Sequence, residues 1–303
     1  MITDGIYPGV NFDTYAHGAE WEGRMNPGCI ELAVRQTMAH VRADFLGLRE
    51  REETQPLTFG SAAHCRMIEP DRFKLAYAMG EQCVAFTKYG KGPRCSKAGT
   101  GRFDGQWLCS SHAPDGVASK VERLTEKEAA TIEGMRARIL THPAVNLLRQ
   151  NGQAEVCIAW TCPRTGVKMK TRLDKFSPAV GNGLILDLKF IRSANPRDLA
   201  NAIEEYGYAR AGALRQDGIE VLTGKRPEYY LVCVEKDAPY EPVVPMMDDE
   251  TMEGARWEVR GNLQLWANCV KTGKYPGYGD DFVEISAPAW KLQYYRTLKG
   301  GAQ

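Results

Sequence analysis

The sequence predicts a single α/β domain, with helices around a central sheet and a small insertion that needs a metal ion to fold. Amphipathic helical patterns come first, then three strand-like runs in succession, then a helix, a strand and a long helix. No internal repeat or linker separates two large units. Residues 80–116 are rich in Gly, Lys, Ser and Cys and have almost no apolar period. We therefore expect one domain, 1–303, with an inserted module at 80–116.

Composition bounds the possible functions. The chain has 303 residues, of which 43% are hydrophobic, enough to bury a substantial core. Its formal net charge of +1 excludes the strong global field of highly basic nucleic-acid binders, so any contact with DNA must be local. No apolar run approaches the roughly 20 residues of a membrane helix, and the N-terminus lacks a signal-peptide layout, so we expect a cytoplasmic protein without a membrane partner. Nine cysteines, an odd number, favour free thiols and a metal site over a disulfide framework.

The N-terminal third reads as helical. Residues 28–50 predict one amphipathic helix, because their apolar side chains recur every three or four positions. A second helix is expected at 59–70, with Ser61 as its N-cap and Pro70 as its stop.

The remaining elements follow from their periodicity and their boundary residues. A helix should open with a capping box formed by Thr125 and Glu128, and a turn-forming SPAVGNG segment should join two strands into a hairpin. Trp257 and Trp266, at helical spacing, are expected in the core. In chain order the expected elements are a helix at 125–150, strands at 154–160, 167–176 and 183–191, a helix at 196–216, a strand at 228–236 and a helix at 247–273.

The strongest chemical pattern lies in the two hairpin strands, TRLDKF and ILDLKF. Asp174 ends the first strand, and Asp187 and Lys189 lie on the second. Because strand side chains alternate, Asp187 and Lys189 point to one face, with the Leu188 carbonyl available between them. Carboxylate and carbonyl oxygens suit Mg²⁺ or Mn²⁺, and Lys189 could activate a water or neutralise charge on a phosphodiester.

A lone D-x-K in a strand is usually a surface charge pair. Here the strand is otherwise apolar, and burying an acid and a lysine there is costly unless they are paired or bound to metal. Glu155, which begins the neighbouring strand, could supply a third carboxylate. His64 lies on the predicted helix four residues after Gly60; taken alone, such a histidine is more often a core residue.

These motifs resemble the RecE-like branch of the PD-(D/E)XK nucleases, phage and prophage exonucleases that work with a single-strand annealing protein. The likeness begins at FGSAAHCRMIEPDRF, passes through Glu155, Asp174 and the Asp187, Lys189 pair, and ends at NLQLWANCVKTGKYPGYGDD. The resemblance implies a restriction-endonuclease-like fold, in which helices flank a mixed central sheet. It also implies 5′-to-3′ resection of linear double-stranded DNA in phage-type recombination, by a ring-like homo-oligomer working with a RecT-like annealing protein.

The resemblance also implies roles for individual residues. Asp174 and Asp187 would bind Mg²⁺ (or Mn²⁺) together with the Leu188 carbonyl, and His64 would line this metal site. Lys189 would assist the attacking water, and Glu155 would support the site.

The chain departs from the family at one helix. There the family carries a Gln and, four residues on, a Tyr facing the site, whereas this sequence has Ala211 and Arg215. Tyr208, Arg210, Arg215 or Gln216 could substitute, since an arginine can hold a DNA phosphate. Two alternatives to an exonuclease therefore stay open: an endonuclease of the same fold, and a catalytically weak DNA-binding or adaptor protein that uses its metal module for recognition.

The insertion offers three thiols and an imidazole, from Cys83, Cys95, Cys109 and His112. This is the ligand set of a closed structural zinc site, and its final C-x2-H spacing resembles small treble-clef-like modules. Four unrelated groups scattered on a loop would be the alternative. A segment with so little apolar content needs a staple to fold, which favours Zn²⁺.

Overall fold

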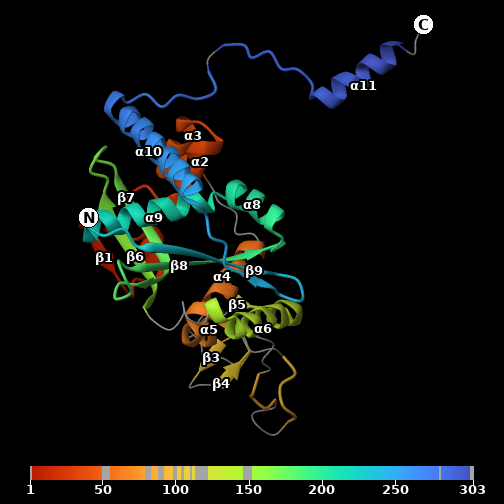
Figure 1. Ribbon diagram of the computed structural model, residues 1–303. Helices are drawn as coiled ribbons and strands as arrows, with labels where there is room; N and C mark the ends of the chain where they lie inside the picture. The colour runs from red at the N-terminus through yellow and green to blue at the C-terminus, as the bar shows by residue number, and fades with distance from the viewer. Residues whose placement is uncertain are drawn as a thin grey trace.

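A six-stranded mixed sheet forms the centre of the protein, as the computed structural model shows (Figure 1). The structure describes residues 2–49, 55–78, 83–87, 92–97, 101–103, 106–109, 111–112, 122–145, 152–279 and 281–300. Neighbouring strands are antiparallel except β8 and β9, which are parallel. In sheet order the strands are β1 (Gly5–Tyr7), β6 (Gln153–Thr161), β7 (Lys168–Ser177), β8 (Leu184–Ile191), β9 (Glu228–Glu235) and β10 (Pro242–Val243). The expected α/β fold, with its β7–β8 hairpin, is confirmed.

One face of the sheet is covered by four helices, two from each end of the chain (Figure 1). They are α2 (Pro27–Arg35), α3 (Met38–Phe45), α9 (Tyr208–Thr223) and α10 (Asp249–Thr272). Their apolar stripes meet alternate strand residues in the larger core, which includes Ile30, Val41, Ile158, Trp160, Ile185, Leu214, Val259, Leu263 and Trp266. Burial of these stripes fixes α9 against the strands that carry the acidic residues.

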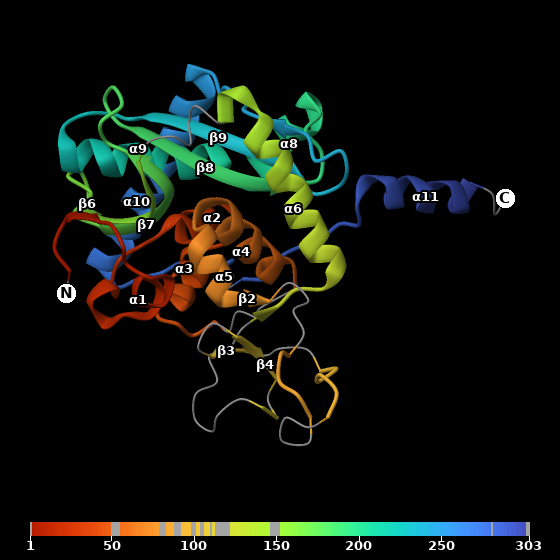
Figure 2. The ribbon, with the colours of Figure 1, turned by 90° about the horizontal axis from the view of Figure 1, so that it is seen from below.

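The opposite face carries α4 (Gln55–Ile68), α5 (Pro70–Ala76) and α6 (Glu126–Thr141) (Figure 2). Two small residues of α4, Ala62 and Ala63, are fully buried, and their size lets the helix pack closely on this face of the sheet. The second core contains Phe73, Ile132, Met135, Leu186, Leu188, Val232 and Val234. A further helix, α8 (Pro196–Glu205), packs through Leu199 on Ile191 and Leu231. Leu186 and Leu188 therefore face α4 and α6, which leaves Asp187 and Lys189 directed the other way.

Several predicted boundaries were wrong. The helix expected at 28–50 is two helices, because the backbone is extended at Gln36 and Thr37, the latter starting α3. Likewise, the helix expected at 196–216 breaks at Gly207, whose φ of 66° is left-handed. Ser61 lies inside α4 rather than capping it, and Pro70 begins α5, where a missing N–H costs nothing.

Two other expectations had mixed outcomes. The capping box of Thr125 and Glu128 is present, but α6 ends at Thr141, and residues 146–150 lie outside the described part of the chain. Trp266 is buried as expected, whereas Trp257 is 62% exposed on the outer side of α10 and was wrongly placed in the core.

The ends of the insertion are held together by a short parallel pair, β2 (Tyr77–Ala78) and β5 (Glu122–Arg123). Within it, β3 (Gly101–Phe103) and β4 (Gln106–Leu108) form an antiparallel pair. Figure 2 shows this module projecting beyond α5 and α6. None of the described residues of this module belongs to either main core.

The two ends of the chain differ in their attachment. Near the N-terminus, α1 (Phe12–His17) and the short helix η1 (Ala19–Trp21) pack Tyr15 and Trp21 against β6. At the other end, α11 (Ala289–Gly300) stands apart from the body in both views (Figures 1 and 2), and its Trp290 is 70% exposed. Among the described residues, no helix has the length and apolar character needed to cross a membrane.

Candidate active site and metal centre

The candidate active site lies where β7 and β8 separate. The two strands pair only over Lys175–Ser177 and Leu184–Leu186, after which they diverge. The Asp174 carboxylate fills the fork, and its Oδ2 accepts a hydrogen bond from the Leu188 N–H at 2.7 Å. The Asp174 side chain thus accepts a hydrogen bond from a backbone N–H that further pairing of β7 with β8 would have satisfied. This contact places Asp174 next to the D-x-K strand.

Asp187 is enclosed by positively charged and hydroxyl groups. Its side chain is 1% exposed. Oδ1 accepts a hydrogen bond from Lys189 Nζ at 2.7 Å, while Oδ2 lies 2.8 Å from Arg215 NH1 and accepts a 2.8 Å hydrogen bond from the Tyr229 hydroxyl. Burial by itself raises the pKa of Asp187, but the charges of Arg215 and Lys189 outweigh burial and hold the pKa below its usual value. Asp187 is therefore a buried, ionised carboxylate.

Glu155 and Asp174 form a second acidic pair. Pairing of Ala154 with Lys175 and of Val156 with Leu173 puts Glu155 opposite Asp174. The backbone of Glu155 has φ of 53°, a strained left-handed conformation for a non-glycine residue. Burial raises the pKa of Glu155, and the Asp174 charge raises it further, to about 8, against the lowering effect of Arg172 at 2.8 Å. Two carboxylates held together at this cost favour a positively charged ligand between them.

His64 closes the site from the side of α4. Its Nδ1 lies 3.6 Å from Asp174 Oδ2, and its ring packs edge-on against Phe190. Burial lowers the pKa of His64 below its usual value, although Asp174 acts in the opposite direction. A neutral imidazole beside a carboxylate can serve as a metal ligand or accept a proton.

A cavity of about 560 Å³ opens beside His64 and Lys189. Its wall combines aromatic rings, from Phe59, Phe190 and Tyr208, with the exposed amines of Lys127 and Lys236. In the described part of the chain neither amine has a side-chain partner. Rings that stack on bases and amines that pair with phosphates are what a nucleic-acid strand requires.

The oxygen donors of the fork fit a hard divalent cation. Glu155 and Asp174 offer carboxylates, and the Leu188 carbonyl lies within the same fork. Asp187 is a further carboxylate, with Lys189 at Oδ1 and Tyr229 and Arg215 at Oδ2. Glu155 is likewise paired with Arg172, and the Leu188 carbonyl accepts a hydrogen bond from Lys189 at 3.2 Å. The donor chemistry of the fork suits Mg²⁺ or Mn²⁺.

The structure brings together every residue expected at this site: His64, Glu155, Asp174, Asp187, Leu188 and Lys189. Sequence reasoning missed Arg172 and Tyr229. Arg172 lies two residues before Asp174 on the same strand, so both side chains point to one face. Alternation along TRLD could therefore have indicated that Arg172 lies at the site. Tyr229 belongs to a parallel neighbour, β9, whose register against β8 has no signal in the sequence.

Only some of the four candidates for the Gln and Tyr positions reach the site. Arg215 contacts Asp187, and Tyr208 lies on the cavity wall with the Lys189 amine 5.8 Å from its ring centre. Arg210 instead pairs with Glu31 at 2.7 Å, which holds α9 to α2. Gln216 bonds to the Pro227 carbonyl.

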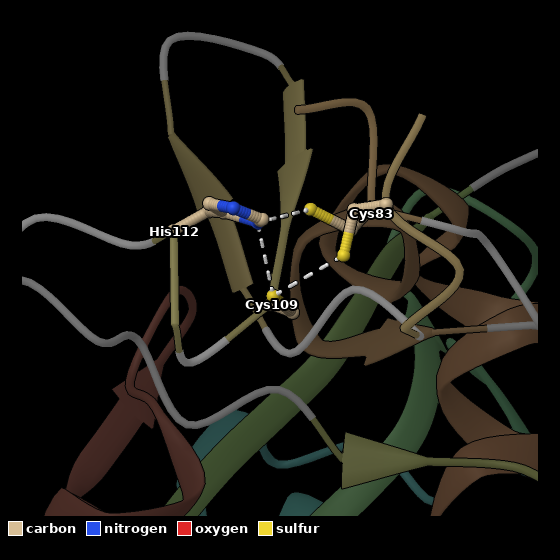
Figure 3. Close-up of side chains that lie close together, drawn as sticks. Cys83, Cys109 and His112 are labelled. Atoms are coloured by element: carbon tan, nitrogen blue, oxygen red, sulfur yellow. Dashed lines mark hydrogen bonds between the residues drawn. The ribbon is translucent and has the colours of Figure 1, made fainter. Parts of the chain in front are cut away.

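The cysteine and histidine side chains of the insertion converge as predicted (Figure 3). The ligand atoms of Cys83, Cys95, Cys109 and His112 all lie within 4.8 Å of one another. Figure 3 shows Cys83, Cys109 and His112 pointing toward one another. The Cys95 and Cys109 sulfurs are 3.9 Å apart, and His112 Nδ1 lies 3.4 Å from Cys83 Sγ and 3.3 Å from Cys109 Sγ. Tetrahedral bonds to Zn²⁺ would place such atoms about 3.5 to 3.8 Å apart. The cluster therefore fits zinc.

Comparison with known proteins agrees with this geometry. Residues 32–282 match a family described as a PDDEXK-like domain of unknown function (DUF3799). A crystal structure of a candidate exonuclease from Eubacterium rectale is similar, with a TM-score of 0.58 and 17% identity, covering 93% of this chain and 97% of that one. At this identity the likeness shows the fold alone. No curated protein matches the chain.

The divergent strands with Asp174 and the Asp187-x-Lys189 motif, in a mixed sheet flanked by helices, define the PD-(D/E)XK class, the restriction-endonuclease-like nuclease fold. Within that class, the chain belongs to the DUF3799 family of PDDEXK-like domains.

Proposed function

We propose that this protein is a metal-dependent deoxyribonuclease that hydrolyses phosphodiester bonds. One observation carries the proposal: the Asp174 carboxylate, with Glu155 opposite it on the next strand, binds the backbone of the D-x-K strand at Leu188, and Lys189 of that strand lines an open cavity. A structural role alone would not explain two acids held side by side with a strained backbone.

The residues divide the work by their chemistry. Glu155 and Asp174, with the Leu188 carbonyl, would hold Mg²⁺ or Mn²⁺, and His64 and Asp187 adjoin them. The ion supplies Lewis acidity towards a phosphate oxygen. Lys189, whose side chain is 23% exposed on the cavity wall, neutralises charge on the phosphate and orients a water. Neutral His64 can take a proton.

We further propose an exonuclease that acts on ends of linear double-stranded DNA, 5′ to 3′, in phage-type recombination. The RecE-like motifs support this proposal, as does the name of the Eubacterium rectale neighbour. The same resemblance supports a ring-like homo-oligomer and a RecT-like annealing protein as partner.

We propose that residues 80–116 form a structural zinc module inserted into a single nuclease domain. Its support is the convergence of Cys83, Cys95, Cys109 and His112, with all three thiols buried. The β2–β5 pair would connect the zinc-stabilised module to the rest of the domain.

The decisive test uses linear duplex DNA labelled at the 5′ or 3′ end, and covalently closed circles, each with Mg²⁺ or EDTA. We expect Mg²⁺-dependent loss of the linear substrate, 5′ label released first, and no cleavage by Asp174→Asn. Asp281→Asn, an exposed acid of the C-terminal segment, is the matched control and should retain activity. Cleavage of circles would instead establish the endonuclease.

A DNA-binding or adaptor protein is the second candidate, and the Arg215–Asp187 ion pair favours it, because a cation already occupies one acid of the site. Binding of DNA without cleavage of any substrate, in Mg²⁺ or in Mn²⁺, would support that function and reject the nuclease.

A further inference from the structure

Tyr229 reaches the site from β9, and the proposed division of chemical work among the site residues does not use it. Its hydroxyl donates a 2.8 Å hydrogen bond to Asp187 Oδ2. Burial and the nearby Asp187 charge raise the pKa of Tyr229 well above its usual value, so the phenol keeps its proton and acts as a donor. The β8–β9 register sets Tyr229 opposite Ile185, two residues before Asp187. The hydrogen bond therefore joins a neighbouring strand to the acid of the D-x-K motif.

The facing surface of α9 is shaped to admit the Tyr229 ring. At Gly212 a methyl group would lie 2.5 Å from Tyr229 Cε1, closer than packed carbon atoms approach, so a side chain there would displace the ring. One turn later, Gln216 donates a 2.8 Å hydrogen bond to the Pro227 carbonyl, two residues before Tyr229. Packing of α9 on β9 thus fixes the ring and, through it, the position of the hydroxyl.

The groups around Asp187 act on it in different ways. Lys189 Nζ donates to Oδ1 at 2.7 Å, but Lys189 also lines the cavity, where a phosphate would compete for its charge. Arg215 NH1 lies 2.8 Å from Oδ2 without the direction of a hydrogen bond, so it supplies charge rather than orientation. Tyr229 donates a hydrogen bond to the same oxygen and is not part of the cavity wall. Its hydroxyl is therefore a directional contact that a ligand in the cavity leaves in place.

We propose that Tyr229 is a positioning residue, which holds Asp187 by Oδ2 and leaves Oδ1, the oxygen on the Lys189 side, for the divalent ion, and that Gly212 makes room for this contact. The inference rests on the proposed nuclease site and deepens it. A carboxylate already fixed by a hydrogen bond on one oxygen has less freedom to lose when its other oxygen binds an ion. Loss of such a supporting bond weakens ion affinity about 10- to 100-fold.

Calorimetric titration of the purified full-length chain with Mn²⁺, in the absence of DNA, tests this role. Tyr229→Phe removes only the hydroxyl, and Mn²⁺ affinity should fall about tenfold or more. Tyr230→Phe is the matched control, because it removes the same group from the next residue of β9, whose side chain packs on the second core; it should bind like the wild type. Unchanged affinity in Tyr229→Phe, or an equal loss in Tyr230→Phe, overturns the inference.

Gly212→Ala reaches the same contact from α9. Its methyl group should displace the ring and lower Mn²⁺ affinity as Tyr229→Phe does. The double variant should show no further loss, because both changes remove one and the same hydrogen bond. Gly254→Ala on α10, where an added methyl group meets nothing within 4 Å, is the control and should change nothing. Losses that add in the double variant would show that Gly212 does not act through the hydroxyl, and would reject its part in the proposal.

Cleavage assays separate this inference from the nuclease itself. In a wild type that cleaves linear DNA, Tyr229→Phe should need about tenfold more Mn²⁺ for half-maximal rate and should recover at saturating ion; a rate that stays low at every Mn²⁺ concentration rejects the positioning role. Cleavage by the wild type with unchanged ion affinity in Tyr229→Phe rejects the role of Tyr229 and keeps the nuclease. Weaker Mn²⁺ binding by Tyr229→Phe in a protein that cleaves no substrate keeps that role and rejects the nuclease.

Discussion

Replacing Glu155 by Gln should stabilise the metal-free protein while abolishing its activity. Glu155 is 13% exposed in its side chain and lies opposite Asp174, and its pKa is raised from 4.5 to about 8 by burial and then by the Asp174 charge. The folded protein therefore favours the neutral carboxyl group, which a glutamine amide imitates. Loss of the carboxylate would remove one of the proposed metal ligands.

The upward shift of the Glu155 pKa decides how the stability of the protein changes with pH. Below the unfolded-state pKa, Glu155 is neutral in both states and folding incurs no penalty. As pH rises from 4.5 to about 8 the unfolded state loses its proton first, so the wild type loses stability throughout this interval and none beyond it. Each pH unit in this interval lowers the wild type's free energy of unfolding by about 1.4 kcal/mol. The loss caused by Glu155 is therefore up to about 3 kcal/mol at pH 7 and below about 1 kcal/mol at pH 5.

Thermal unfolding in EDTA measures this difference. At roughly 2 °C per kcal/mol, Glu155→Gln should unfold about 6 °C above the wild type at pH 7 and within about 2 °C of it at pH 5. Glu205→Gln, an exposed replacement on α8, is the control and should show no such dependence. A gap between Glu155→Gln and wild type that is constant with pH, or a less stable variant, would refute the reasoning.

Three further predictions concern the rest of the molecule. The purified protein should contain one equivalent of zinc, and either chelation or Cys109→Ser should release it and expose the insertion to protease; a zinc-free protein with a resistant insertion would contradict this. Replacing Lys127 and Lys236 on the cavity wall by Ala should weaken DNA binding about tenfold and lower the salt slope by about 2, whereas Lys271→Ala on α10 should leave both unchanged. Deleting residues 282–303 should shift the unfolding temperature by less than about 1 °C, because α11 adds nothing to the described core; a larger drop would show that it packs on the body.

Much of the site could be predicted because it depends on local patterns. Strand-like runs identified β6, β7 and β8, and the hairpin between the last two brought Asp174 to the D-x-K strand. In the insertion, soft ligands in a segment too polar to bury a core indicated a metal cluster. Each of these signals lies within a few residues along the chain or follows directly from side-chain chemistry.

Helix boundaries were predicted less well, since periodicity does not reveal a short interruption. One apolar stripe runs through α2 and α3, and only packing against α10 and the sheet decides that the chain bends at Thr37. Similarly, helical spacing could not say which side of α10 faces the core, so Trp266 is buried and Trp257 is exposed.

By itself the sequence determined the four central strands β6 to β9, which acids and which lysine they carry, and the ligand set of the insertion; it did not indicate the short edge strands β1 and β10. Only the tertiary structure decided how Arg215 and Glu155 are placed among those charges. Docking of α9 on the sheet brings Arg215 to Asp187, and the β6–β7 register sets Glu155 opposite Asp174. The first contact depends on burying apolar surface between α9 and the sheet, and the second on the register of two strands, so neither follows from local sequence, whereas the Asp187–Lys189 pair follows from alternation along one strand.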